Sequence, residues 1–217
     1  MVTIISPRVS ETYKSRKKLE LLQAAKQVFI AKGFQAATMQ DIMDQAGISR
    51  GALYGYFDNI EHVYIELLQY EDEQDASYFT METAESAWPR IEKWVLLQQE
   101  RIERADQSIV RANSEFFLSE NYRKHKERYP YISARYERLV QALSAFLQAG
   151  AEQGDFKLRK PAAAISQFII SYIDGLMLDT AHLGTEQIGS VRQLEVFLLA
   201  LRQLLDSDKE GKKGAGK

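Results

Sequence analysis

The sequence predicts an all-α protein with a small N-terminal domain and a larger C-terminal domain. Three observations support this prediction. Apolar residues recur at spacings of three and four along most of the chain, as they do on one face of a helix. Alternating runs of Val, Ile or Thr, which indicate strands, are weak. Gly and Pro residues divide the chain into segments of helical length.

The composition excludes several kinds of protein. At 217 residues the chain can form a large core in one or two domains. It contains no Cys, which excludes a disulfide framework, a thiolate metal site and a Cys nucleophile. No apolar segment follows a basic start in the first 30 residues, and no run approaches the roughly 18 apolar residues of a spanning helix. We therefore expect a soluble, cytoplasmic protein that does not bind a membrane.

The first element is a predicted helix over residues 19–34, LELLQAAKQVFIAKGF. A basic cluster, Lys14, Arg16, Lys17 and Lys18, lies just ahead of it. Residues 1–60 hold eight basic and five acidic residues, a net charge of +3, whereas the rest holds 20 basic and 25 acidic residues, a net charge of −5. A basic segment on an acidic body is typical of a modular nucleic-acid reader, although a solvated first helix gives the same charges.

The second predicted helix, over residues 38–47, carries signals at both ends. Thr38 is a good N-cap, and Asp41 three positions later gives an acidic variant of the capping box. Gly47 can take the left-handed conformation that ends a helix. The apolar face between the two ends consists of Met39, Ile42, Met43 and Ala46.

A third, short helix follows, with Ser49 as its cap. Leu53 and Phe57 lie four apart and should face inward. The opposite side carries Gly51, Tyr54 and Gly55. Two glycines cost a helix roughly 1 kcal/mol each against alanine, so this surface is suited to the close approach of another molecule. Two such helices form a helix-turn-helix pattern, although capped helix pairs also occur in proteins that never touch DNA.

Residues 15–63 resemble the N-terminal domain of the tetracycline-repressor (TetR) family of bacterial transcriptional regulators. The positions that fall at the family's spacing are Gly33, Phe34, Thr38, Ile42, Ala46, Gly47, Ser49, Leu53, Tyr54, Tyr56 and Phe57. The resemblance implies a DNA-binding domain over residues 1–60 and a ligand-binding and dimerisation domain over residues 61–208. Residues 209–217 form a low-complexity tail that we expect to be disordered.

The resemblance and the motif together predict a set of DNA contacts. Arg50 is long enough to reach guanine O6 and N7 or a phosphate, and the Tyr hydroxyls suit phosphates. The predicted DNA-binding residues are Lys17, Thr38, Met39, Ser49, Arg50, Gly51, Ala52, Tyr54 and Tyr56. One position departs from the family pattern: Ile60 stands where the family usually has a phosphate-binding Lys, so we expect operator binding to depend less on salt.

The remaining chain reads as helices up to about residue 205. The predicted segments are 59–77, 88–105, 108–119, 131–153, 161–184 and 185–205, with a short basic segment at 122–128. The last two are apolar over a wide stripe. They are either ordinary core helices or, as the resemblance implies, half of a four-helix bundle in a two-fold dimer. The predicted interface residues are Ile169, Ile173, Leu176, Leu194, Phe197, Leu198 and Leu201.

Aromatic residues between these ends suggest a ligand pocket, although aromatic stripes at helical spacing more often fill a core. The predicted ligand-binding residues are Trp94, Gln98, Phe116, Phe117 and Tyr172. Glu115 and Asp174 are further polar candidates if they point inward.

No motif for catalysis, a cofactor or a metal stands out. The tail sequence GKKGAGK lacks the Ser or Thr and the helix of a phosphate-binding loop. The pairs His62 with Glu66 and Asp179 with His182 lack an evident third ligand. The preferred interpretation is a homodimeric repressor that an unidentified small molecule releases from a palindromic double-stranded DNA operator. An all-helical enzyme or ligand-binding module, and a helical adaptor for protein partners, remain alternatives.

Overall fold

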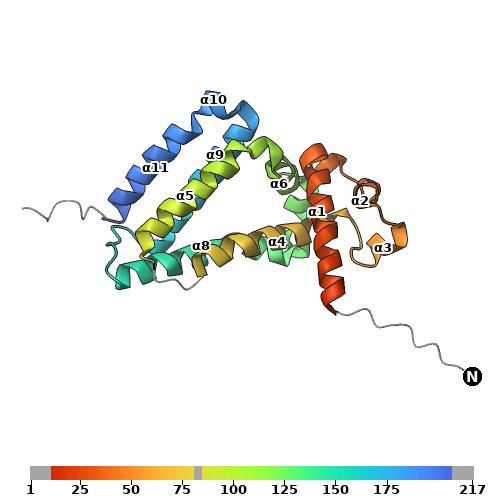
Figure 1. Ribbon diagram of the computed structural model, residues 1–217, viewed down its shortest axis with the longest axis horizontal. Coiled ribbons are helices and arrows are strands. Elements are labelled where there is room, and N and C mark those ends of the chain that lie inside the picture. The colour runs from red at the N-terminus through yellow and green to blue at the C-terminus, as the bar shows by residue number, and fades with distance from the viewer. Residues whose placement is uncertain (1–10, 81–84, 207–217) are drawn as a thin grey trace, which may run out of the picture.

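The computed structural model describes residues 11–80 and 85–206, and the regular elements in those residues are helical. The molecule is elongated (Figure 1). Helices α1, α2 and α3 gather at one end, and α5, α8, α9 and α11 form a bundle at the other. Helix α4 leads from the first group to the second, and α6 lies against α1.

The helices have the following bounds: α1 Glu11–Ala36, α2 Met39–Ala46, α3 Arg50–Tyr54, α4 Ile60–Thr80, α5 Ala87–Glu103, α6 Val110–Phe117, α7 Glu120–Lys124, α8 Pro130–Glu152, α9 Ala162–Leu183, α10 Thr185–Ile188 and α11 Ser190–Leu204. Two short 3₁₀ turns, η1 Ala105–Gln107 and η2 Lys126–Arg128, connect α5 to α6 and α7 to α8.

Helix α1 begins eight residues before the predicted start at position 19. Residues 12–16 of its added turns are exposed and mostly polar, so apolar periodicity gives no sign of them. Ion pairs stabilise this part instead: Lys17 bonds Glu20 one turn on at 2.9 Å, and Lys18 bonds Glu66 of α4 at 2.7 Å. Near its C-terminal end α1 is kinked at Gly33, whose φ is 74°.

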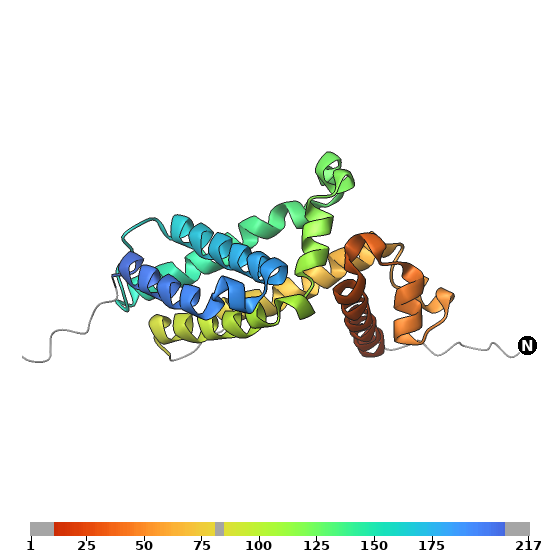
Figure 2. The ribbon, with the colours of Figure 1, turned by 90° about the horizontal axis from the view of Figure 1, so that it is seen from above.

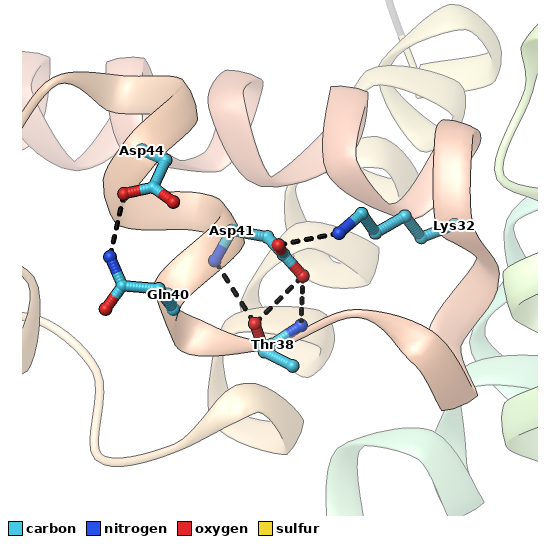
Figure 3. Close-up of polar contacts among 5 residues, drawn as sticks. All are labelled: Lys32, Thr38, Gln40, Asp41 and Asp44. Atoms are coloured by element: carbon cyan, nitrogen blue, oxygen red, sulfur yellow. Dashed lines mark hydrogen bonds and ion pairs between the residues drawn. The ribbon is translucent and has the colours of Figure 1, made fainter.

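The predicted caps of α2 are confirmed, and Figure 3 shows the N-terminal one. The Asp41 N–H donates to the Thr38 hydroxyl oxygen at 3.2 Å, and the Asp41 carboxylate accepts the Thr38 N–H at 3.0 Å. Lys32 of α1 bonds the same carboxylate at 2.6 Å, and together with Thr38 it holds the pKa of Asp41 below its ordinary value. Gly47 ends the helix with a φ of 63°.

Helix α3 also follows its local signals. The Ser49 hydroxyl oxygen accepts the Ala52 N–H at 3.4 Å. Leu53 and Phe57 are buried, whereas Gly51 and Tyr54 are exposed, as predicted. The two short helices are therefore fixed by their buried side chains and by caps at both N-termini.

The buried residues form two apolar clusters. The first joins α1, α2, α3 and α4 to α6 and the start of α8. The second lies within α5, α8, α9 and α11. The expected domain boundary at residues 60 and 61 falls at the start of α4, and the first cluster continues across it through residues such as Tyr64 and Phe116.

The predicted last helix is wrong in one respect. The segment 185–205 forms two helices, α10 and α11, separated by Gly189 with a φ of 61°. A left-handed residue cannot continue a right-handed helix, so the chain turns there. The predicted tail at 209–217 lies outside the described residues.

The predicted dimer-interface residues lie mostly in the interior of a single subunit. Ile169, Ile173, Leu176, Leu194, Phe197 and Leu201 are buried in the second cluster, and Leu198 is half-buried against it. Helix α11 packs against both α5 and α9 of its own chain (Figure 2). The wide apolar stripes are therefore covered largely within one subunit, and these side chains belong to its core.

Helix α9 is, among the described residues, the one helix long and apolar enough to cross a bilayer. Core helices of soluble proteins pass the same test of length and composition. Seven α9 residues, among them Ile165 and Ile173, are buried against neighbouring helices. This packing covers part of its apolar surface, and Phe168, Leu178 and Leu183 remain exposed.

Candidate nucleic-acid interface and ligand cavity

The start of α2 and the outer side of α3 share one surface groove of about 520 Å³. Met39 and its neighbour Thr38, the cap of α2, line one side, and Arg50 and Tyr54 line the other from α3. These four predicted DNA-binding residues therefore lie together. Ser49, Gly51 and Ala52 are exposed on α3 and at its cap, and Tyr56 is half-buried just beyond the helix.

Arg50 is held in place by its neighbour on α3. Its guanidinium carbon lies 5.2 Å from the centre of the Tyr54 ring, a cation–π contact one helical turn away. Arg50 is exposed, so its hydrogen-bond donors are accessible from solvent. A planar fork of donors on the exposed side of a short helix suits guanine edges or phosphates.

Gly51 is not required by packing within the subunit. A Cβ added there would meet no atom within 4 Å, and the backbone of Gly51 is not in the left-handed region. The glycine therefore leaves open space on the exposed side of α3. That space permits close approach of a partner, in agreement with the prediction from the sequence.

The basic N-terminal residues are partly neutralised inside the protein. Lys17 bonds Glu20, which raises the pKa of Lys17, and Tyr56 adds a smaller effect in the same direction. Lys18 and Lys26 bond Glu66 and Glu71 of α4, Lys26 at 2.8 Å. The net charge of residues 1–60 thus overstates the free positive charge of this surface.

Ile60 begins α4 at the edge of the groove, beside Asn59. The Asn59 side-chain oxygen accepts the His62 N–H at 2.8 Å and so caps the helix. Ile60 is half-buried against the first cluster. The position that carries a Lys in the resembling family is therefore at the predicted DNA surface, with an apolar side chain.

A separate cavity of about 470 Å³ lies between α6, α8 and α9. Its wall is mostly apolar, with Tyr136 and Leu178 exposed at the edge. The lining residues are Val110, Asn113, Ser114, Phe117, Leu118, Tyr122, Ile132, Arg135, Tyr136, Leu139, Ile170, Asp174, Met177 and Leu178. An apolar wall with a few polar groups is typical of a small-molecule site.

Of the five predicted ligand residues, Phe117 alone lines this cavity. Phe116 is buried in the first cluster. Trp94 packs on Phe79 with ring centres 5.5 Å apart, and Tyr172 stacks on Phe197 at 4.6 Å. Gln98 is buried on α5. The three aromatic side chains pack against neighbouring helices, because a large ring on an apolar stripe gains most when another helix covers it.

The two further polar candidates have different positions. Asp174 lines the cavity. Glu115 instead accepts the backbone N–H of Gln35 at 2.9 Å, so its carboxylate faces α1. A residue one position away on a helix points about 100° aside, which is why Ser114 lines the cavity and Glu115 does not.

Three polar residues of the cavity, Asn113, Ser114 and Arg135, were not predicted from the sequence. Asn113 and Arg135 bond α4. The Tyr64 hydroxyl donates to the Asn113 side-chain oxygen. The Arg135 Nε donates to both carboxylate oxygens of Asp72, at 2.8 and 2.6 Å.

Asp72 is a buried carboxylate, 8% exposed, with partners at both of its oxygens. The Tyr131 hydroxyl also donates to it at 2.6 Å; burial and this bond raise the pKa of Tyr131 to about 12. One signal in the sequence marked this cluster. Asp72 follows Leu68 by four residues on a buried stripe of α4, and a charge in such a stripe needs a partner.

The histidine pairs noted in the sequence are not assembled into a metal site in the described part of the chain, where no group of three or more His, Asp or Glu side chains has suitable geometry. His62 Nε2 lies 3.5 Å from Glu66, and Asp179 and His182 are exposed.

Two segments of the chain match protein families. Residues 21–67 match bacterial regulatory proteins of the tetR family, and residues 90–190 match the tetracyclin repressor-like C-terminal domain. The first segment covers α2, α3 and most of α1, and the second covers the helices around the cavity.

Individual relatives agree with these matches. The chain is 28% identical to the HTH-type transcriptional regulator YfiR of Bacillus subtilis over 95% of this chain and 100% of YfiR. It is 28% identical to the HTH-type transcriptional repressor KstR2 of Rhodococcus jostii over 66% of this chain and 70% of KstR2. The fold resembles that of the Bacillus subtilis regulator FadR in complex with stearoyl-CoA, with a TM-score of 0.63, 19% identity, and coverage of 87% and 98% of the two chains. The chain therefore belongs to the tetracycline-repressor (TetR) family of bacterial transcriptional regulators.

Proposed function

We propose that this regulator is a cytoplasmic repressor that a small molecule, bound between α6, α8 and α9, releases from its operator. One observation carries the proposal: two residues of the cavity wall are bonded directly to α4. Asn113 accepts a hydrogen bond from the Tyr64 hydroxyl, and Arg135 bonds Asp72. Helix α4 begins at the groove that holds Arg50 and Tyr54.

Through these two bonds a ligand in the cavity can displace α4 at two positions. Tyr64 lies in the second turn of α4 and Asp72 two turns later, so their partners hold the helix along its length. A ligand that moves Asn113 or Arg135 must move α4 or break a partly buried hydrogen bond. It changes operator affinity only through its different affinity for the two arrangements.

The wall indicates the kind of effector. Ten of the fourteen lining residues named above are apolar or aromatic, so most of the ligand should be apolar. Asn113, Arg135 and Asp174 offer a small polar end. The stearoyl-CoA bound by FadR has a long apolar chain. We therefore propose an effector with a substantial apolar part and one polar group.

We also propose that the regulator acts as a homodimer on two operator half-sites. The dimer face would use exposed side chains of α9 and α11 in place of the buried ones predicted from the sequence. Phe168, Val196 and Leu199 are 39%, 63% and 62% exposed, and the small residues Ser171 and Gly175 allow close helix approach. A two-fold dimer would place two copies of α3 about one duplex turn apart, roughly 34–36 Å.

The test is binding to DNA from the region upstream of the protein's own gene. Fluorescence anisotropy with labelled duplexes should show salt-dependent, sequence-specific binding by the wild type. Arg50→Ala should lower specific affinity by about 1–3 kcal/mol, or roughly 5- to 150-fold, and Tyr54→Ala should lower it less.

Arg123→Ala is a matched control, because Arg123 is an exposed Arg on α7, outside the α2–α3 groove. It should leave operator affinity unchanged. Equal losses in both Arg variants, or no sequence preference in the wild type, would refute the proposed operator binding.

A further inference from the structure

Helix α6 has one side on the cavity and another on α1. Asn113, Ser114 and Phe117 line the cavity. Glu115 and Phe116 contact α1 instead, and the α1–α6 contact is among the most extensive in the molecule (Figure 1). The same eight-residue helix therefore touches the proposed effector site and the DNA-binding end.

The α1 contact centres on the kink at Gly33. There the backbone leaves helical geometry, with φ 74° and ψ −179°. The Glu115 carboxylate lies in this kink. One of its oxygens accepts the Gln35 N–H at 2.9 Å, and the other accepts from the Arg111 Nε at 2.8 Å.

A side chain at position 33 would displace the Glu115 carboxylate. A Cβ there would lie 2.4 Å from one Glu115 oxygen, and the positive φ is unfavourable for any residue with a Cβ. Moving the carboxylate aside would break its bond to Gln35. The absence of a Cβ at Gly33 thus makes the space that the Glu115 carboxylate occupies.

The hydrogen bonds also determine the charge state of Glu115. Burial alone would raise the pKa of its carboxyl, but the Gln35 N–H and the Arg111 guanidinium outweigh burial and hold the pKa below its ordinary value. The group is therefore a carboxylate at neutral pH, and it accepts strong, charge-assisted bonds.

The kink lies directly ahead of the helix-turn-helix. Only a few residues separate Gly33 from Thr38, which caps α2. Phe34 within this stretch packs on Phe116 and on Tyr64, each with ring centres 4.9 Å apart. Lys32, just before the kink, bonds Asp41 of α2 (Figure 3).

We propose that Glu115 is a positioning residue for operator binding: its carboxylate fixes the α1 kink, and so the placement of α2 and α3, and it passes displacement of α6 to α1. From the same helix, Glu115 reaches α1, whereas Asn113 reaches α4. The transmission of α6 displacement to α1 rests on the proposed effector site, whereas the positioning role of Glu115 needs only the helix-turn-helix.

The first test compares Glu115→Ala, Glu115→Gln and the control Glu120→Ala in the full-length protein. Glu120 is an exposed α7 residue that pairs with Lys124. Glu115→Ala should weaken operator binding by at least about fivefold. Glu115→Gln keeps an oxygen that can accept the Gln35 N–H, so it should restore part of the loss, and Glu120→Ala should match the wild type.

The second test needs no DNA. Amide hydrogen exchange at residues 34–41 should rise in Glu115→Ala, while exchange in α9 and α11 stays as in the wild type. Unchanged exchange at residues 34–41 would overturn the positioning role, as would a uniform rise, which indicates a general loss of stability instead. A wild type that binds no operator but shows the local rise in Glu115→Ala would refute the proposed function alone.

A double-variant comparison isolates the fit of the carboxylate. Gly33→Ala should lower the Tm less in the Glu115→Ala background than in the wild type, because the clash with the carboxylate has gone and only the backbone strain remains. Equal Tm shifts in the two backgrounds would show that the carboxylate does not occupy the kink in solution.

Discussion

The DNA-binding end and the bundle at the far end hold their shapes by different means. In α2 and α3, which have eight and five residues, caps at Thr38, Gly47 and Ser49 determine where each helix begins or ends. In α9 and α11, which have 22 and 15 residues, the N-termini have no side-chain cap bonds, and the apolar stripes determine the packing.

This difference shows which sequence patterns are sufficient to predict a local structure. A cap acts within four residues, so its meaning is local and the sequence reports it directly. An apolar stripe indicates only that its surface is covered, either by the same subunit or by a partner. Phe197 is 1% exposed in a single subunit, whereas Leu199, two residues on, is 62% exposed. Only packing distinguishes the core from a surface available to a partner.

The largest effect should come from the bundle core. Phe197→Ala removes a buried ring that stacks on Tyr172, and it should lower the free energy of unfolding by about 3–5 kcal/mol. Urea unfolding followed by circular dichroism would measure the change. A variant that alters dimerisation but not subunit stability would contradict the assignment of Phe197 to the core.

The exposed side of the same helix should respond differently. Leu199→Arg should disfavour the proposed dimer by on the order of 2–5 kcal/mol, because it places a charge on an apolar interface next to its own symmetry copy. Subunit stability should change by less than about 0.5 kcal/mol. Analytical ultracentrifugation would show a monomer with native helicity, and an unchanged sedimentation profile would exclude this face as the interface.

Gly51 tests the DNA-binding end. Gly51→Ala meets open space and improves helix propensity, so it should stabilise the free protein by up to about 1 kcal/mol. It should also weaken operator binding, since the new methyl group occupies the proposed contact surface. Thermal unfolding and anisotropy measure the two effects, and stronger operator binding would show that α3 does not approach DNA on this side.

Ile60 tests the neutralisation of a single phosphate. Ile60→Lys should steepen the dependence of log K on log salt by about 0.9 for each additional phosphate that the protein neutralises. Affinities at several salt concentrations would measure that slope. A changed affinity with an unchanged slope would mean that position 60 does not meet a phosphate.

The smallest effect concerns acid stability. The folded-state pKa of Glu115 is lowered from 4.5, so the carboxylate stabilises the fold in full above that pH, and the contribution is lost as pH falls through the lower folded-state value. The Tm difference between the wild type and Glu115→Gln should be constant above pH 4.5 and shrink below it. If the Tm difference grew as the pH fell, the pKa of Glu115 would be raised in the folded state and not lowered.

Much of the fold followed from local patterns. The all-helical class, the capping box of α2, the left-handed Gly47 and the inward positions of Leu53 and Phe57 were predictable because each depends on neighbouring residues. The start of α1 and the break at Gly189 were not, because ion pairs and a single backbone conformation leave weak periodic signals.

The sequence by itself determined the helix-turn-helix and its caps, because each depends on residues within a few positions of one another. It also indicated the family, through motif positions spread over residues 15–63. Only the tertiary structure decided the rest. It covered the stripes of α9 and α11 within one subunit, placed Asn113 and Arg135 in the cavity wall, and turned Glu115 toward α1. These outcomes depend on contacts between distant parts of the chain, such as Gln35 with Glu115, 80 positions apart, which no local periodicity records.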